Sequence, residues 1–346
     1  TAGTAGAPVT VNLGWEPQYL LVKKATNSTN ASFENWFVWD TMRGLTMLDD
    51  ATLAANLTTA EGGTNINSGN YVNPTPTGFI VDPTSQGFHG VNYPAGAQFI
   101  YIAIRRGPMK TPTVGTSVFA PVAYAGTGGA KTITSGFPVD MLAIKRRSPL
   151  ASSWGGPSSR LTGTGQNLTF NLTDAEWAGG STYPSFASNT GTSMTTADLW
   201  FNDVNQSSQY VSYNFRRAPG FFDVVCWTSA GTDTVSHNLA VAPELIIRKR
   251  RNSTSNWVVY AAPLGADKRL LLETTSASDT NLDNWQNTTP TASVFYSGNT
   301  ISGGTYVAYL FATVAGVSKV GSYTGTGTTL QVDCGFTGGA RFVLIK

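Results

Sequence analysis

Internal repetition constrains the fold of this chain more than any other feature of its sequence. A short strand-like motif ending in a cation occurs four times, at residues 14–24, 136–146, 241–249 and 335–346. The cations that align at its end are Lys23, Lys145, Arg248 and Lys346. Each copy is rich in leucine and β-branched residues and follows a turn containing glycine or proline, which is typical of a β-strand.

Two further motifs recur in phase with the first. An aromatic strand motif occupies residues 99–106, 210–217 and 306–311, and a tryptophan motif occupies residues 35–40 and 256–260, with a looser copy at 153–154. Units of about 100 residues exceed the 20–50 residues of a solenoid repeat, so each should have its own core. Strand-like runs alternate with Gly, Asn, Ser and Thr clusters. We therefore predict an all-β chain of tandem β-sandwich domains.

The motif spacing predicts the domain boundaries. We expect β-sandwich repeats at residues 1–108, 109–219 and 220–312, followed by the opening strands of a further repeat at 313–346. The second and third repeats open with an extra strand that the first repeat lacks. The simplest account is a window from a longer polypeptide. The alternative is that the C-terminal strands complete the first domain of a neighbouring subunit, which would form a filament. Residues 49–61 are the best helix candidate, and no more than a short surface helix is expected there.

Composition excludes several classes of function. The net charge is only +2, which argues against nucleic acid and anionic membranes as partners. No apolar run reaches the roughly 18 residues that span a bilayer, so membrane insertion is not expected. Hydrophobic residues make up 41% of the chain and charged residues 12%, the opposite of a disordered composition.

Chemistry-bearing residues are scarce. The chain has two histidines, His89 and His237, both expected at the surface, and two cysteines, Cys226 and Cys334, expected as small buried residues. We therefore predict no catalytic residues, no metal and no cofactor, and a protein that is not an enzyme. The recurring basic pairs at strand ends are expected to cap strands, protect sheet edges or form salt bridges between domains.

The combined pattern resembles a repeat of tailed-bacteriophage tail and fibre proteins. In the first repeat the matching residues are 14–24, 35–40 with Arg43-Gly44, Gly78-Phe79 and 99–104. The second repeat departs from it, because Trp154 precedes Gly155-Gly156-Pro157 instead of an aromatic strand. The resemblance implies a jelly-roll or lectin-like sandwich and a virion structural or host-adhesion role.

Aromatic residues in polar loops are the candidate binding site. Trp177 and Trp285 lie beside carboxylates and amides, which suits an indole stacking on a sugar while its neighbours bind the hydroxyls. Tyr183 and Trp200 are weaker candidates of the same kind. The alternative for all four is anchoring of a loop or an interface with another subunit. Trp36, Trp39 and Trp257 are expected in the core.

These observations predict a virion protein at the particle surface. We expect a tail fibre or tail-associated protein that helps attach to the host by multivalent weak binding. Its partners would be other virion subunits, itself as a trimer or filament, and a host surface glycan. One alternative is a capsid or tail decoration protein that acts as a spacer without ligand binding. The other is a carbohydrate-binding module or a polysaccharide depolymerase, which would need two carboxylates about 5–10 Å apart.

Overall fold

The fold is all-β, as the sequence predicts. The computed structural model describes residues 7–26, 34–47, 50–62, 69–82, 95–105, 110–147, 156–178, 184–194 and 208–346. Within these ranges every regular element is a strand, apart from two single-turn 3-10 helices at Gly115–Ser117 and Ala262–Leu264. Strands pair antiparallel throughout the described sheets, and two sheets enclose each core, which is the β-sandwich type of arrangement.

The chain divides into two compact units. The first comprises residues 1–108 and 160–163. Its two sheets have the strand orders β4-β3-β2-β7 and β1-β6-β5. Its core lies between them and includes Leu20, Trp39 and Phe79. The strands are β1 (Val9–Asn12), β2 (Pro17–Lys24), β3 (Phe37–Asp40), β4 (Leu53–Ala54), β5 (Val72–Thr75), β6 (Gly78–Val81) and β7 (Phe99–Arg105).

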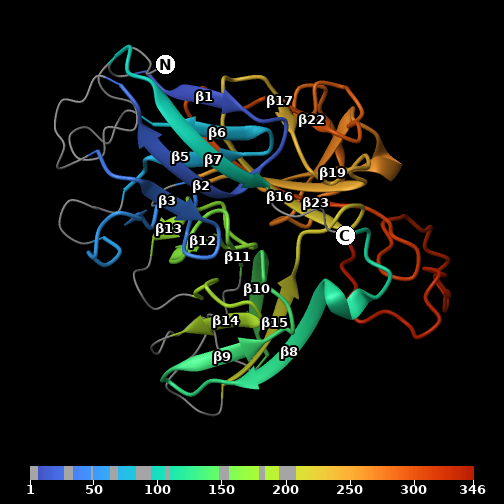
Figure 1. The fold of residues 1–346 in the computed structure, drawn as a ribbon. Helices are drawn as coiled ribbons and strands as arrows, with labels where there is room; N and C mark the ends of the chain where they lie inside the picture. The colour runs from blue at the N-terminus through green and yellow to red at the C-terminus, as the bar shows by residue number, and fades with distance from the viewer. Residues whose placement is uncertain are drawn as a thin grey trace. The chain divides into compact units, whose positions relative to one another are not determined.

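The second unit comprises residues 109–159 and 164–346 and contains two sandwich cores. In its earlier part the sheets have the orders β11-β10-β15-β8 and β14-β9. Figure 1 shows β8, β15 and β10 side by side. The strands are β8 (Phe119–Ala125), β9 (Lys131–Thr134), β10 (Met141–Arg146), β11 (Pro157–Ser159), β12 (Gln166–Asn167), β13 (Trp177–Ala178), β14 (Gly191–Met194) and β15 (Gln209–Phe215).

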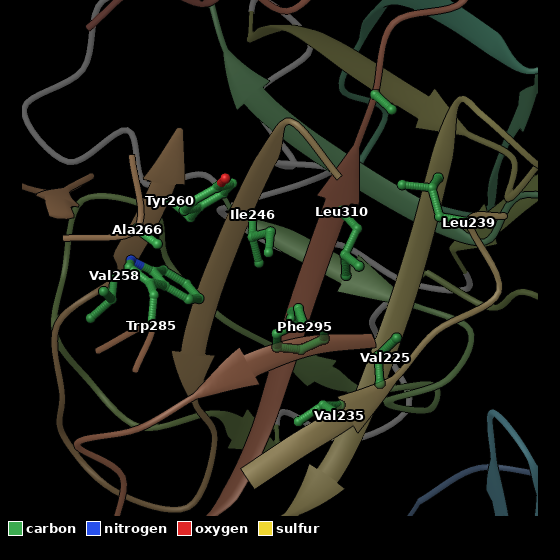
Figure 2. Packing of buried hydrophobic residues seen from close by; sticks show 12 residues of the cluster. Val225, Val235, Leu239, Ile246, Val258, Tyr260, Ala266, Trp285, Phe295 and Leu310 are labelled. Carbon is green, nitrogen blue, oxygen red and sulfur yellow. The ribbon is translucent and has the colours of Figure 1, made fainter. Parts of the chain in front are cut away.

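The later part of the second unit has a six-stranded sheet of order β16-β23-β18-β19-β20-β21 and the pair β17-β22. Figure 2 shows its core, in which Val235 and Phe295 of the pair face Ile246 and Leu310 of the larger sheet. The strands are β16 (Phe222–Thr228), β17 (Asp233–Ser236), β18 (Leu245–Arg250), β19 (Val258–Ala261), β20 (Lys268–Leu271), β21 (Asp279–Thr280), β22 (Val294–Ser297) and β23 (Thr305–Phe311).

Strand register changes one alignment made from the sequence. Lys23 lies opposite Ile100, Lys145 opposite Val211, and Lys249 opposite Val307. The third cation of the series is therefore Lys249 and not Arg248. Arg248 is one residue earlier and points to the opposite face of β18, because side chains alternate along a strand.

Residues 50–61 form no helix, which agrees with the limit of no more than a short one; they contain β4, because Leu53 and Ala54 pair with Val38 and Phe37 of β3. One local expectation was wrong. Residues 312–346 form turns without strands, although 313–346 was expected to carry opening strands. By contrast, the glycine- and proline-rich stretch after Trp154 does contain a strand, since β11 pairs with β10 from Met141 to Ala143.

Candidate functional site

The four aromatic residues proposed to bind a glycan differ in their exposure to solvent. Trp177 is 41% exposed, which leaves its ring accessible. Trp285 is only 1% exposed, so the expectation that it stacks on a sugar was wrong. Tyr183 and Trp200 lie outside the described residues.

Trp285 is buried because its loop folds back over the third core. Its ring meets Tyr260 edge-on at 5.7 Å, and the Arg248 guanidinium lies 5.0 Å from its centroid. Figure 2 shows the indole surrounded by Val258, Ala266 and Tyr260. The alternative expectation, loop-to-core anchoring, describes this residue.

Trp177 is held in place through the residue before it. The Glu176 amide donates to the Arg251 carbonyl at 2.6 Å, and the Glu176 carboxylate accepts from the Arg251 guanidinium at 2.6 Å. Both side chains are nearly buried. Trp177 begins β13, which pairs with β12 through Asn167. The exposed indole therefore projects from a fixed backbone.

Glu176 ends a segment that covers the third core from outside. We call residues 169–176 the covering segment. The outer face is the face of the six-stranded sheet that is turned away from the pair β17-β22. Indole Nε1 of Trp257 donates to the carbonyls of Thr169 and Leu172 at 2.9 and 3.1 Å. Lys249 Nζ donates to the Thr173 carbonyl at 2.6 Å. The covering segment thus covers the Trp257 and Lys249 donors and also supplies the carbonyls that accept their hydrogen bonds.

Burial changes the electrostatics under the covering segment. Desolvation lowers the pKa of Lys249 to about 8, against a smaller opposing attraction from Glu273. It also raises the pKa of the Tyr309 hydroxyl well above its usual value. Although burial alone would lower the pKa of Arg251, the attraction of Cys226 and Glu176 outweighs it and the pKa is raised. Lys249 is the one of these cations that burial leaves easiest to deprotonate.

In the first unit the corresponding face belongs to the sheet β4-β3-β2-β7, on the side turned away from β1-β6-β5, and it carries exposed apolar side chains. Trp36, which aligns with Trp257, is 38% exposed, and Ile100, Ile102 and Ile104 of β7 are exposed as well. Lys23 Nζ donates to the Glu34 carbonyl, much as Lys249 donates to the Ser255 carbonyl. The outer face of the first sheet therefore presents an indole and an apolar row to solvent.

Three of the described basic residues form buried ion pairs. Arg217 pairs with Asp223 at 2.5 Å, and Lys24 pairs with Glu34 at 2.6 Å. Arg251, which directly follows β18, pairs with Glu176 at the end of the covering segment. All of these side chains are largely shielded from water, so their contribution is to fix positions rather than to protect exposed edges.

The buried carboxylates are also structural. Asp50 accepts from the amides of Tyr71 and Val72 at 2.9 and 2.7 Å, which joins its loop to β5. Asp140 accepts from the Arg217 amide at 2.7 Å.

The remaining reactive residues differ in accessibility. His237 is buried, so the expectation of a surface residue was wrong; His89 lies outside the described residues. Cys226 is buried as expected, whereas Cys334 is partly exposed. Among the described residues no three His, Cys, Asp or Glu side chains come together in a way that could hold a metal ion. In the same residues no helix is long and apolar enough to cross a membrane.

Comparison with known proteins adds one family match. Residues 220–346 match a domain of unknown function, DUF7483. The matched stretch begins at residue 220, where the third repeat is expected to begin, and it includes residues 313–346. No curated protein and no solved structure matches the chain.

Sequence reasoning found Trp177 but missed its surroundings. Trp257 is buried, as expected, but the sequence did not predict that its indole would donate to Thr169 and Leu172 of the covering segment. Their role is carried by backbone carbonyls, which have no side-chain signature. The recurrence of a tryptophan and a lysine on one sheet face was visible in the motifs and is the signal that could have indicated this site.

Proposed function

We propose that the chain is a non-enzymatic structural protein of a virion appendage of the tail-fibre type. The observation that carries the proposal is the ion pair of Glu176 and Arg251, buried between successive repeats. Removing one member of a buried pair costs about 3–5 kcal/mol, so the junction resists separation. A junction of this kind suits a protein that transmits force or spaces other subunits. The resemblance to phage tail and fibre repeats gives the virion setting.

The disposition of the acidic groups favours this function over the depolymerase alternative. Glu176 is paired with a guanidinium, and Asp50 and Asp140 accept from backbone amides. Each is committed to holding two parts of the fold together. A glycosidase needs instead two carboxylates that face a common cleft and a substrate.

The virion setting is tested by locating the protein in particles. Antibodies raised against residues 1–346 would be applied to purified virions from infected cultures and observed by immunoelectron microscopy. We expect labelling of the tail or its fibres. Label confined to the soluble fraction of the lysate, with unlabelled particles, would contradict the proposal.

Host-surface attachment at Trp177 is a second function, and the exposure of this indole on a fixed strand favours it. The test is a glycan array with the intact chain, Trp177→Ala and Trp36→Ala. Trp36 is the matched control because its exposure, 38%, is close to the 41% of Trp177. We expect binding that Trp177→Ala removes and Trp36→Ala retains. Equal binding by all three would contradict a site at Trp177, and absence of binding would leave the structural function alone.

A further inference from the structure

The edge of β7 differs from the edges of its counterparts. In the second repeat β15 lies between β10 and β8, and in the third repeat β23 lies between β18 and β16. Among the described strands β7 pairs with β2 alone. Its other edge presents a row of backbone amides and carbonyls, which is a template for a further strand.

The side chains of β7 make this edge adhesive. Ile100, Ile102 and Ile104 are all exposed on its outer face. Their counterparts in the third repeat include Val307 and Tyr309, which are buried. Proteins ordinarily protect an exposed edge with charge, proline or a bulge. The run from Phe99 to Ile104 contains no charged residue and no proline. The one register shift in its pairing with β2 lies between Pro17 and Tyr19.

The C-terminal segment repeats the turn that introduces the corresponding strand. Ala218 forms a bridge with Phe222, and β16 begins at Phe222. Val314 forms a bridge with Ser318, and this pair is separated by four residues like Ala218 and Phe222. Both turns contain a glycine with positive φ, 76° at Gly220 and 72° at Gly316. Residues 318–324 are therefore the counterpart of β16, yet they form no strand.

The register of this counterpart is set by aromatic stacking. Tyr124 stacks on Tyr210 at 5.3 Å, and Trp227 stacks on Tyr306 at 5.4 Å. In each pair the two residues lie directly opposite in the ladder. The counterpart of the first ring is Tyr323, which is 52% exposed, and that of the second is Phe99. Pairing these two would place Val320 opposite Ile102.

We infer that residues 318–324 of one copy pair antiparallel with the open edge of β7 in a second copy. Tyr323 of the donor stacks on Phe99 of the acceptor. The Ser229 amide donates to the Gly304 carbonyl at 2.8 Å in the third repeat, and by the same alternation the amides of Gly321 and Tyr323 would face the edge of β7. Because donor and acceptor are different surfaces, the contact is heterologous and joins more than two copies, in a ring or in an open filament. This inference rests on strand pairing and is independent of the virion assignment.

Cysteine pairing between separate chains tests the inference. Cys334→Ser, which removes the thiol of the C-terminal segment, would be the background for Ile102→Cys in one preparation and Val320→Cys in another. Opposed residues of antiparallel strands lie about 4.5–5.5 Å apart at Cα, within disulfide range. On mixing under mild oxidation we expect a disulfide-linked heterodimer, identified by mass spectrometry of the joined peptides.

The control replaces the donor position by one outside the proposed strand. Leu330 is exposed, like Tyr323. The variant Leu330→Cys should give at least tenfold less heterodimer with Ile102→Cys than Val320→Cys gives. Equal yields from both mixtures would overturn the inference. So would a single-chain double variant that forms only an intrachain disulfide, since the donor would then serve its own copy.

Assembly provides the second measurement. By sedimentation velocity we expect the intact chain to grow in mass with concentration, because unpaired donors and edges find one another. Gly321→Pro removes a ladder amide and should abolish this growth, whereas Thr328→Pro should retain it. Neither position lies in a strand of the structure, so both variants should fold. Growth that Gly321→Pro leaves unchanged would overturn the inference.

Discussion

The Glu176 carboxylate lies 2.6 Å from the Arg251 guanidinium, and this contact joins the covering segment to the end of β18. The same two residues are also joined by a backbone hydrogen bond of 2.6 Å. Buried ion pairs add little net stability but are costly to break, so they specify one arrangement over others. The contact therefore fixes how the covering segment lies on the outer face of the third sheet.

Breaking this pair should destabilise the second unit. Glu176→Ala leaves the Arg251 guanidinium buried without its carboxylate, and we expect a loss of about 3–5 kcal/mol in the free energy of unfolding. Urea denaturation followed by circular dichroism measures it. Asp279→Asn is the control, because Asp279 forms an exposed pair with Arg269 at 2.9 Å. That change should cost far less stability, because water surrounds the exposed pair. Similar losses for both would contradict a buried junction.

The two loop tryptophans should respond oppositely to truncation. Trp285→Ala removes a buried indole and should cost about 3–5 kcal/mol of stability. Trp177→Ala removes an exposed one and should change stability by less than about 1 kcal/mol. Thermal denaturation of both variants beside the parent chain measures the contrast. Equal destabilisation would show that Trp177 is packed in the folded protein.

The second sandwich depends on a glycine at which two strands approach closely. A Cβ at Gly191 would lie 2.0 Å from the Ile133 carbonyl oxygen, and Gly78 stands in the same relation to Val11 at 1.9 Å. Gly191→Ala should therefore separate β14 from β9 and cost several kcal/mol, on the order of 2–4. Gly129→Ala is the control, since its Cβ meets nothing within 4 Å. Unfolding curves with equal midpoints would contradict the close approach.

Acid should destabilise the third core through His237. Its Nδ1 accepts from the Leu239 amide at 3.2 Å, so the ring is neutral, with its proton on Nε2 beside the Thr291 carbonyl. Burial lowers the pKa of His237 despite the nearby charge of Asp223. The unfolded chain then binds more protons below pH 6.5, and stability falls as the pH drops through that range.

The measurement is the melting temperature from pH 7.5 to 5, compared with His237→Gln. The parent chain should lose stability faster than the variant over this range. Parallel curves for the two proteins would show that His237 does not carry the effect.

Alkali should act in the opposite direction at Lys249. Its pKa of about 8 in the fold lies below the 10.5 of a solvated lysine. Between these values the unfolded chain binds more protons, so the contribution of Lys249 to stability rises with pH. We expect the stability difference between the parent chain and Lys249→Met to shift in favour of the parent from pH 8 to 10. A constant difference across this range would show that the ammonium is solvated.

Motif periodicity was sufficient for the all-β class because strand signals are local. The strands that begin at Met141 and Leu245 follow the expected β-branched pattern and pair as antiparallel neighbours of β15 and β23. Burial of a loop is not local. Trp177 and Trp285 stand in similar polar surroundings in the sequence, yet one is exposed and the other packs against Tyr260. That difference arises from tertiary contacts.

The one-residue error at Arg248 has a similar origin. A run of cations from Arg248 to Arg251 offers several equivalent alignments with Lys23. Only pairing with β23 decides which of them faces outward, because a shift of one residue changes the face of every side chain. The sequence-based alignment had no information about that pairing.

Hydrogen exchange of the intact chain tests the central claim, that the covering segment is a fixed part of the third sandwich. The decisive amide is that of Ser255, which donates to the Thr173 carbonyl at 2.8 Å. It is protected from exchange with water only while the covering segment is bound to the sheet. We predict that the amides of Ser255 and Glu176 exchange as slowly as those of β18, and that Glu176→Ala accelerates both. Exchange of these two amides at the rate of exposed loops in the parent chain would contradict the account.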